Sequence, residues 1–431
     1  MRRIGTDKLL SCIFFVIVSS FVLKADDNGA YSGFAPYSIY GVGDLFTGGS
    51  AYNMTMGGVG IASRNNKFIN SLNPASVTAR DSLSFMSDFS VYQNNKIFRQ
   101  GDSRSANNLF NINDIILSFP LFHNTAAMVG IKPYSTSGYG FNYYETNPGV
   151  VGTVGNVLHS YSGQGSIYQI FVGGGIKLFD RLNIGAEYIH YIGNLNKTYS
   201  QSFVSDASAL GKKIETESIL NSNSAKFGLQ YEQSFGKKLS FVAGATYKLS
   251  SRLNGFINTT VSNGSIEISN VSDTLSLRQE SLMLASEAGV GLAMVYGRNF
   301  RAEFDYTISD WSNTNFAPEG IFATSLAESF RFGMEYIPRP NDVRYYRNII
   351  AYRAGAYFTK NYYTVGSQPI YARGVTLGVT LPVFQWYNGL TLGFEFGQRG
   401  SLKNSLVQET YFNFSLGINL FDIWFQQYRY E

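Results

Sequence analysis

Apolar and polar residues alternate in segments of about ten residues from Leu83 onward. The last segment, for example, sets Phe412 and Phe414 against Asn413 and Ser415. A period of two is typical of β-strands that present one apolar face. The pattern predicts about fourteen strands, at residues 83–93, 111–122, 125–135, 165–178, 182–194, 223–235, 239–254, 284–297, 300–311, 328–338, 349–360, 371–383, 389–399 and 409–425.

The links between these segments alternate in length. Tight links fall at residues 123–124, 179–181, 236–238 and 298–299, whereas long polar links fall at 136–164, 195–222 and 255–283. Outer-membrane barrels have short periplasmic turns and longer outer loops. The order therefore predicts that both chain termini lie in the periplasm, with 339–348 as an unusually long periplasmic link.

Composition narrows the fold class. The 431 residues are 15% charged and 16% aromatic, whereas soluble domains are roughly 25% charged. Beyond the N-terminus no apolar run is long enough for a spanning helix. A soluble sandwich also alternates, but its polar face is normally richer in Lys and Glu. Because backbone in hydrocarbon must be fully paired, a spanning sheet closes on itself. We therefore predict an all-β, transmembrane antiparallel barrel in a Gram-negative cell outer membrane.

The N-terminus reads as a secretory signal. Arg2, Arg3 and Lys8 precede an apolar run at residues 9–23, which predicts a signal peptide over residues 1–25. Four basic residues less one aspartate give this segment +3 of the chain's formal charge of +4. The mature chain is therefore nearly neutral, and its charge does not indicate a nucleic-acid partner.

The single cysteine, Cys12, lies inside this predicted signal. It stands ahead of the apolar run, whereas the cysteine of a lipoprotein signal follows that run. The mature chain is therefore expected to have no cysteine and no disulfide.

Residues 26–80 do not have the strand pattern, and residues 81–431 form the predicted barrel domain. Fourteen strands enclose more space than their own side chains fill, so 26–80 is predicted to be an N-terminal hatch that plugs the lumen. Its glycines Gly57, Gly58 and Gly60 allow close packing and positive φ.

A second hatch motif is Asn73, Pro74 and Ala75. Proline fixes its own φ and favours extended geometry at Asn73, so the chain is expected to turn sharply where the hatch passes to the wall. Both a structural turn and a contact with cargo fit this motif. If cargo contacts it, replacing Pro74 is expected to reduce uptake more than barrel assembly.

The order of motifs at residues 40–43 (YGVG), 56–62 (MGGVGIA) and 73–75 (NPA) resembles the start of FadL-type and TodX-type outer-membrane transporters, in the versions found in Bacteroidetes-like bacteria. The stretches 352–357 and 421–425 resemble those versions too. The resemblance implies a fourteen-stranded barrel with a lumen hatch. It also implies binding of long-chain fatty acids or aromatic hydrocarbons, with sideways release through a wall opening near the hatch.

Charged residues of both signs fall on the predicted lumen face, where cross-strand pairing is their expected role. Arg353 and Arg373, on neighbouring segments, are candidates to hold a ligand carboxylate by a bidentate contact. The other predicted lumen charges are Glu187, Lys226, Glu232, Arg301, Glu303, Asp305, Arg331, Glu335, Glu395 and Arg399.

Enzyme motifs are not found in the sequence. His123, His159 and His190 are isolated, and His159 is expected to be a solvated histidine of an outer loop. No metal-ligand spacing, Gly-x-Ser-x-Gly or Walker motif occurs. No catalytic residue, metal or cofactor is predicted, and the protein is not expected to be an enzyme.

The predicted function is passive uptake of hydrophobic small molecules, either long-chain fatty acids or aromatic hydrocarbons. Outer-loop aromatics are expected to capture the ligand or to form an interfacial girdle; they are Tyr139, Phe141, Tyr143 and Tyr144. One alternative is a non-transporting structural subunit of an outer-membrane secretion or assembly complex, with protein partners as well as lipid. Another is a general porin for hydrophilic solutes.

Overall fold

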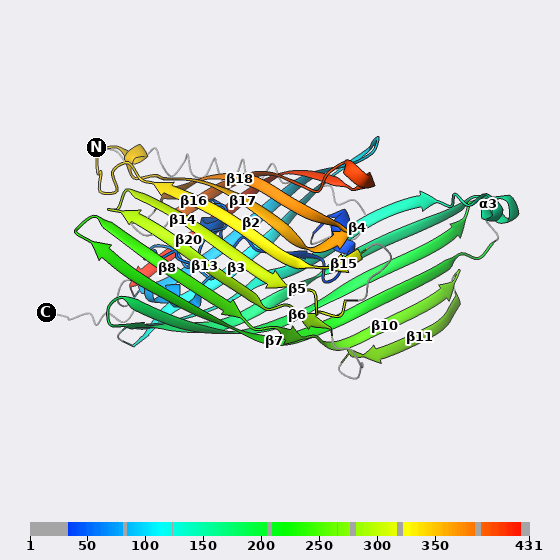
Figure 1. Ribbon diagram of the computed structural model, residues 1–431, viewed down its shortest axis with the longest axis horizontal. Coiled ribbons are helices and arrows are strands. Elements are labelled where there is room, and N and C mark those ends of the chain that lie inside the picture. The colour runs from blue at the N-terminus through cyan, green and yellow to red at the C-terminus, as the bar shows by residue number, and fades with distance from the viewer. Residues whose placement is uncertain are drawn as a thin grey trace, which may run out of the picture. The chain divides into compact units, whose positions relative to one another are not determined.

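Fourteen strands close into an antiparallel barrel in the computed structural model (Figure 1). The structure describes residues 33–80, 84–122, 124–204, 209–264, 266–275, 282–316, 322–383 and 389–423. The predicted signal peptide and the first residues of the predicted hatch lie outside these ranges. None of the described helices is long and apolar enough to cross a membrane.

The barrel strands follow one another around the wall in chain order. They are β2 (Ser84–Gln100), β3 (Ser103–Phe122), β4 (Thr125–Tyr144), β5 (Val157–Leu178), β6 (Leu182–Phe203), β7 (Lys212–Phe235), β8 (Leu239–Lys248), β13 (Glu287–Tyr296), β14 (Phe300–Asp310), β16 (Leu326–Tyr336), β17 (Ala351–Val365), β18 (Gln368–Pro382), β19 (Gly389–Arg399) and β20 (Gln408–Ile423). The ring closes where β20 pairs with β2, from Ser84↔Ile423 to Arg99↔Gln408. The prediction of about fourteen strands is confirmed.

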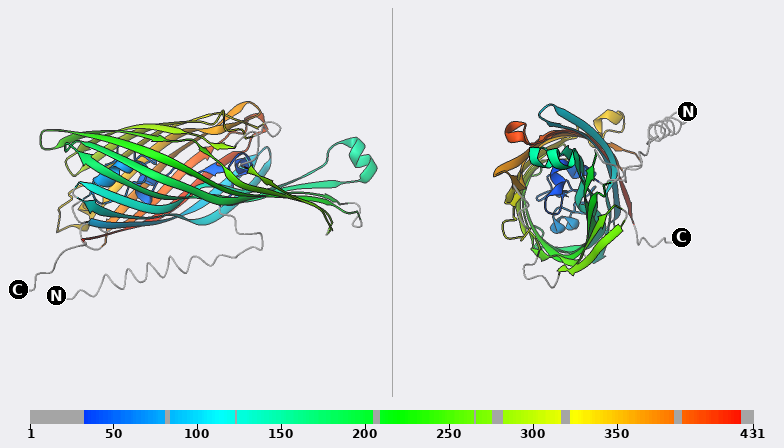
Figure 2. Two further views of the ribbon diagram at one scale, coloured as in Figure 1. Left: turned by 90° about the horizontal axis from the view of Figure 1, so that it is seen from below. Right: turned by 90° about the vertical axis from the view of Figure 1, so that its right-hand side faces the viewer.

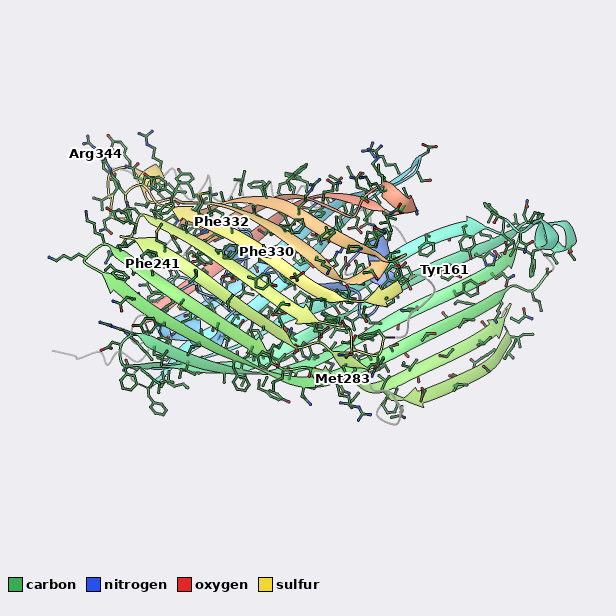
Figure 3. All side chains as sticks on the ribbon, in the orientation of Figure 1. Tyr161, Phe241, Met283, Phe330, Phe332 and Arg344 are labelled. Carbon is green, nitrogen blue, oxygen red and sulfur yellow. The ribbon has the colours of Figure 1, made fainter. Side chains whose placement is uncertain are left out.

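Side chains sort by face as the alternation predicts. On β14, Phe304 is 43% exposed, whereas its neighbours Glu303 and Asp305 are 1% and 2% exposed. Figure 2 shows the closed ring end-on, and Figure 3 shows Phe241, Phe330 and Phe332 among the side chains on its outer surface. The apolar outer band and polar inner face are those of a membrane-spanning barrel.

The three links predicted as long polar loops are mostly strand, and those predictions are wrong. β4 to β7 continue past the rest of the wall, α3 (Pro148–Val154) joins β4 to β5, and β10 (Asn254–Asn263) and β11 (Ile266–Thr274) add a hairpin to β7. We call this extension the fin; it projects to the right in Figure 1. Its Ser, Thr and Asn residues read as loop because they interrupt the alternation of apolar and polar residues that predicts a strand.

The opposite end carries short turns, such as Gly236–Lys238, and is called the short-turn end. The long predicted link 339–348 lies here and is ordered around Asp342, whose carboxylate accepts hydrogen bonds from the Arg344 and Tyr345 amides at 2.7 and 3.1 Å. The Asn348 side chain donates to the same carboxylate. This hydrogen bond is the main reason why the pKa of Asp342 lies below its ordinary value. Short elements β9 (Ser251–Arg252), β12 (Met283–Leu284), β15 (Phe322–Thr324), η4 (Tyr346–Asn348) and η5 (Lys403–Ser405) complete the described wall and its links.

Candidate functional site

Residues 33–80, called here the N-terminal segment, lie inside the ring of strands (Figure 2, right). The segment contains η1 (Pro36–Ile39), β1 (Asp44–Leu45), α2 (Ala51–Met54) and η2 (Pro74–Thr78). Its helices are a single turn or two, so its position depends on contacts with the wall rather than on its own secondary structure.

The glycines singled out in the sequence are contact points with the wall. Gly57 and Gly58 have φ of 72° and 79°, which a glycine adopts without strain. The Gly57 amide donates to Thr376 Oγ1 at 2.8 Å, and its carbonyl accepts from Arg331 Nη1 at 3.0 Å. A Cβ at Gly58 would collide with the same guanidinium.

Asp305 holds the next stretch of the segment. Its Oδ2 accepts hydrogen bonds from the Gly60 and Ile61 amides at 2.6 and 2.9 Å. Hydrogen bonds to a charged acceptor are stronger than neutral ones. This carboxylate on β14 therefore fixes backbone that has no helix or strand of its own.

Asn73 and Pro74 form a buried turn within the lumen. Asn73 has φ −135° and ψ 117°, the extended geometry expected before proline, and its side chain accepts from the Ala75 amide. The Asn73 Nδ2 group donates to Ile61 O at 2.7 Å, which joins two parts of the segment. A Cβ at Gly228 of β7 would collide with Asn73, so the turn seats on a glycine of the wall. A contact of this motif with cargo stays a prediction.

Arg353 is held inside the barrel by groups of the wall and the segment. Its Nε lies 2.7 Å from Glu335 Oε2, and its guanidinium carbon lies 4.5 Å from the Tyr52 ring and 5.0 Å from the Phe68 ring. Arg353 and Glu335 are direct cross-strand partners. Its Nη1 donates to Thr380 Oγ1 at 2.5 Å, whereas its Nη2 is buried without a hydrogen-bond partner among the described residues.

Arg373 points the other way, so its predicted lumen position is wrong. On β18 the even positions face inward, as the burial of Thr376 and Thr380 shows, and Arg373 shares the outer face with the 54% exposed Val375. Its Nη2 donates to Gln398 at 3.3 Å. The structure therefore does not bring Arg353 and Arg373 together.

Further ion pairs join the segment to the wall. Arg399 contacts Asp44 at 2.7 Å and Glu409 at 2.7 Å. Arg64 contacts Glu232 at 3.2 Å, and Arg301 donates to the Arg64 carbonyl at 2.7 Å. Charges that the sequence places in the lumen thus act chiefly by fastening the segment.

A cavity of about 190 Å³ remains between the segment and the wall, and its lining is strongly charged. Lys248 pairs with Glu287 at 3.3 Å, and Lys132 donates to Ser71 Oγ at 3.1 Å. Lys226 and Glu187 also line it. The predicted lumen residues did not include Lys132, Lys248 and Glu287. The signal that could have found Lys132 and Lys248 is their alternation with apolar neighbours in predicted strands. Such a cavity suits water and ions rather than an apolar molecule.

The fin end of the lumen is apolar instead. Tyr40 stacks on Phe322 with ring centroids 4.7 Å apart, and Trp311 lies 4.4 Å from Tyr362. A pocket of about 280 Å³ adjoins this aromatic cluster, and we call it the mouth pocket. Its lining includes Tyr40, Val42, Leu195, Leu220, Leu253, Ile257 and Phe316.

The wall itself is split between β3 and β4. These strands pair only from Ile115↔Ile131 to Phe122↔Thr125, although each continues toward the fin end with its other neighbour. The N-terminal segment takes over the free edge of β4, because β1 pairs with Ser135 and Thr136. We call this place the seam.

The predicted capture aromatics belong to the fin. Tyr139 is buried, whereas Phe141, Tyr143 and Tyr144 are exposed on β4. The Tyr143 ring stacks on His159 at 4.9 Å. These side chains form part of a strand surface rather than a loop.

His159 is buried on β5, so its interpretation as a solvated loop histidine is wrong. Its Nδ1 lies 2.9 Å from Tyr199 Oη and its Nε2 lies 3.5 Å from Glu145. Backbone hydrogen bonds, chiefly from the Asn147 amide, lower the pKa of Glu145. His190 is hydrogen-bonded to Asn223 at 2.7 Å on the outer face, and His123 lies outside the described residues. The described residues contain no cluster of metal-binding side chains.

The closed barrel, its apolar outer band and its charged lumen define an outer-membrane β-barrel. The fold is similar to the toluene transporter TodX of Pseudomonas putida, with a TM-score of 0.59, 13% identity, and coverage of 89% of this chain and 99% of that one. A Pseudomonas aeruginosa FadL homologue has a TM-score of 0.57 and 10% identity, with coverage of 89% of this chain and 98% of that one. The CymD monoaromatic hydrocarbon channel has a TM-score of 0.55 and 13% identity, with coverage of 86% of this chain and 97% of that one.

The BamG family model matches residues 8–431, and the chain belongs to the BamG family. No curated protein matches the sequence. The resemblance to FadL-type transporters is therefore confirmed at the level of fold, while family membership is with BamG.

Proposed function

We propose that this protein is a closed outer-membrane barrel that works as a structural subunit of an outer-membrane assembly or secretion complex. In this proposal the N-terminal segment is a fixed plug, the short-turn end faces the periplasm and the fin stands outside the cell. The observation that carries it is the fastening of the segment by charged groups on the inner face of β14, β16, β17 and β19. Among them are Asp305 and Arg353, which are buried, and Arg331 and Arg399, which are half-buried.

The energetics favour a plug that stays in place. Each hydrogen bond to a charged group contributes about 1.5–3 kcal/mol net, so several such bonds together favour the bound position of the segment. Asp305 alone accepts two from the segment. An apolar molecule that crossed the lumen would also have to pass Lys132, Lys248 and Glu287. The fin adds a large sheet on one side of the membrane, which a conduit does not require and a docking subunit can use.

The test is purification of the tagged full chain from native membranes in mild detergent. We expect other outer-membrane proteins to co-purify in fixed stoichiometry, and the purified chain to give almost no steady conductance in planar bilayers. A chain that purifies alone and conducts steadily would overturn the proposal.

A second candidate function is the uptake of fatty acids or aromatic hydrocarbons, favoured by the apolar mouth pocket and by a fold shared with proteins described as hydrocarbon channels. In this candidate the seam supplies the wall opening. Leu253→Asp places a charge in the mouth pocket and is expected to lower uptake of a labelled long-chain fatty acid at least about tenfold. Leu402→Asp, at an exposed position, is the matched control. Equal uptake by both variants and the wild type, at equal surface amounts, rejects this candidate.

A further inference from the structure

A pocket of about 580 Å³ lies at the short-turn end of the barrel, and we call it the short-turn pocket. Its walls are residues 65–68 of the N-terminal segment and the ends of the strands at the β13–β14, β16–β17 and β18–β19 links. Pockets that hold a small organic molecule measure about 300–1,000 Å³. The short-turn pocket shares no lining residue with the mouth pocket or with the charged cavity beside Lys132, so it is a separate site.

Basic side chains outnumber acidic ones in the lining of this pocket. Its basic residues are Lys67, Arg298, Arg301 and Arg353. Glu335 is the acidic residue of the lining, and Glu303, outside the lining, pairs with Arg301 at 3.2 Å. Four basic residues and two acidic ones leave an excess of two positive charges. A concave site lined mainly by one sign of charge attracts a molecule of the opposite sign.

Arg353 has one donor group to spare for such a molecule. Its Nε donates to Glu335 at 2.7 Å and its Nη1 donates to Thr380 at 2.5 Å. Its Nη2 has no hydrogen-bond partner among the described residues, although the residue is only 3% exposed. A buried donor without a partner is unfavourable, and an anionic oxygen would supply the missing acceptor.

The rest of the lining gives the ligand an apolar part. Phe68, Phe300, Ile337 and Ile349 all line the pocket. The Phe68 ring lies 5.0 Å from the guanidinium carbon of Arg353, so apolar and cationic surfaces adjoin each other. A small inorganic anion would leave the apolar surface in contact with water, whereas an apolar body covers it. The lining therefore matches an amphiphilic anion.

We propose that the short-turn pocket binds a molecule that carries one carboxylate on an apolar body. The carboxylate lies beside Arg353 and Arg301, and the apolar body packs against Phe68 and Phe300. A carboxylate fits one unpartnered donor better than a phosphate group does, because phosphate brings three acceptor oxygens. In this proposal Arg353 has the carboxylate-binding role that the sequence predicts, without Arg373. The inference goes beyond the proposed subunit function and does not depend on it.

The test is isothermal titration calorimetry of the full chain held in amphipol, so that no detergent competes for the pocket. Two carboxylates of different origin are the probes: octanoate, an aliphatic acid, and acetyl-Leu-Phe, a peptide end. Their neutral controls are octanamide and acetyl-Leu-Phe-amide. We expect saturable binding of at least one carboxylate, and binding at least about tenfold weaker of its amide. The carboxylate that binds shows whether the ligand is of the fatty-acid or the peptide kind.

Two variants place the binding in this pocket. Arg353→Lys keeps a positive charge beside Glu335 but has a single nitrogen in place of the guanidinium fork, and we expect the carboxylate to bind at least about fivefold more weakly. Arg298→Gln removes an exposed charge of the rim without disturbing the Glu335 pair, and we expect a loss of about twofold to threefold. Arg373→Lys, on the outer face of β18, is the matched control and is expected to bind as the wild type does.

Three results overturn the inference: neither carboxylate binds, the amides bind as tightly as the acids, or Arg353→Lys and Arg298→Gln both bind as tightly as the wild type. Heat-modified electrophoretic mobility shows that each variant barrel is folded. Co-purification from native membranes reports separately on the proposed function. Stoichiometric protein partners without carboxylate binding would leave the subunit function standing and reject only the pocket.

Discussion

Replacing Asp305 with alanine is expected to loosen the N-terminal segment around Gly60 and Ile61. The substitution removes the acceptor of two backbone hydrogen bonds, from Gly60 and Ile61, and leaves both amides in a buried setting. Two bonds to a charged group correspond to about 3–6 kcal/mol, or about a hundredfold to ten-thousandfold more of the released state. The measurement is the maleimide labelling rate of a cysteine at Ser63, which is 1% exposed, in a Cys12→Ser background.

Asp310→Ala is the matched control on the same strand. Asp310 is exposed and accepts a local hydrogen bond from the Ser312 amide at 3.0 Å. We expect its labelling rate to stay within about twofold of the wild type. If Asp305→Ala labels as slowly as the control, the segment is held by other contacts and the role assigned to this carboxylate is wrong.

Arg353→Met is expected to lower the free energy of unfolding by about 3–5 kcal/mol, because it leaves the buried Glu335 carboxylate without its partner. The loss of cation–π contacts to Tyr52 and Phe68 acts in the same direction. The measurement is equilibrium unfolding of the folded barrel in urea. Adding Glu335→Gln to Arg353→Met is expected to recover part of the loss, which a double-mutant cycle quantifies.

Arg373→Met tests the arginine that faces outward on the neighbouring strand β18. Its side chain is exposed and donates one long hydrogen bond to Gln398. We expect a change within about 0.5 kcal/mol. Equal destabilisation by Arg353→Met and Arg373→Met would contradict the contrast between a buried and an exposed guanidinium.

The strands were predictable from the sequence because lipid imposes a strict rule on alternate residues. Wherever the outer face meets hydrocarbon, as with Phe304 between Glu303 and Asp305, the period of two is plain. The fin was missed because its Ser and Thr residues do not give a clear period of two. Arg373 was misplaced for a related reason, since it lies toward the fin end of β18, where an outward charge can reach water.

For the candidate site, the sequence predicted the types of residue but not their contacts. The sequence shows that glycines, arginines and carboxylates gather in the hatch region and on inward positions. It does not show that Arg353 faces Glu335, because that pairing depends on the register between two strands. The seam was equally hidden, since the pairing of β1 with β4 joins residues about ninety positions apart.

The way the wall closes sets an order for building this molecule. The strand that completes the ring, β20, comes last in the chain, whereas the residues that occupy the lumen and line the seam come first. Sixteen residue pairs join β2 to β20, and once they form they hold the wall closed at this place. We therefore expect the early residues to be gathered while the sheet is still open, before β20 pairs with β2.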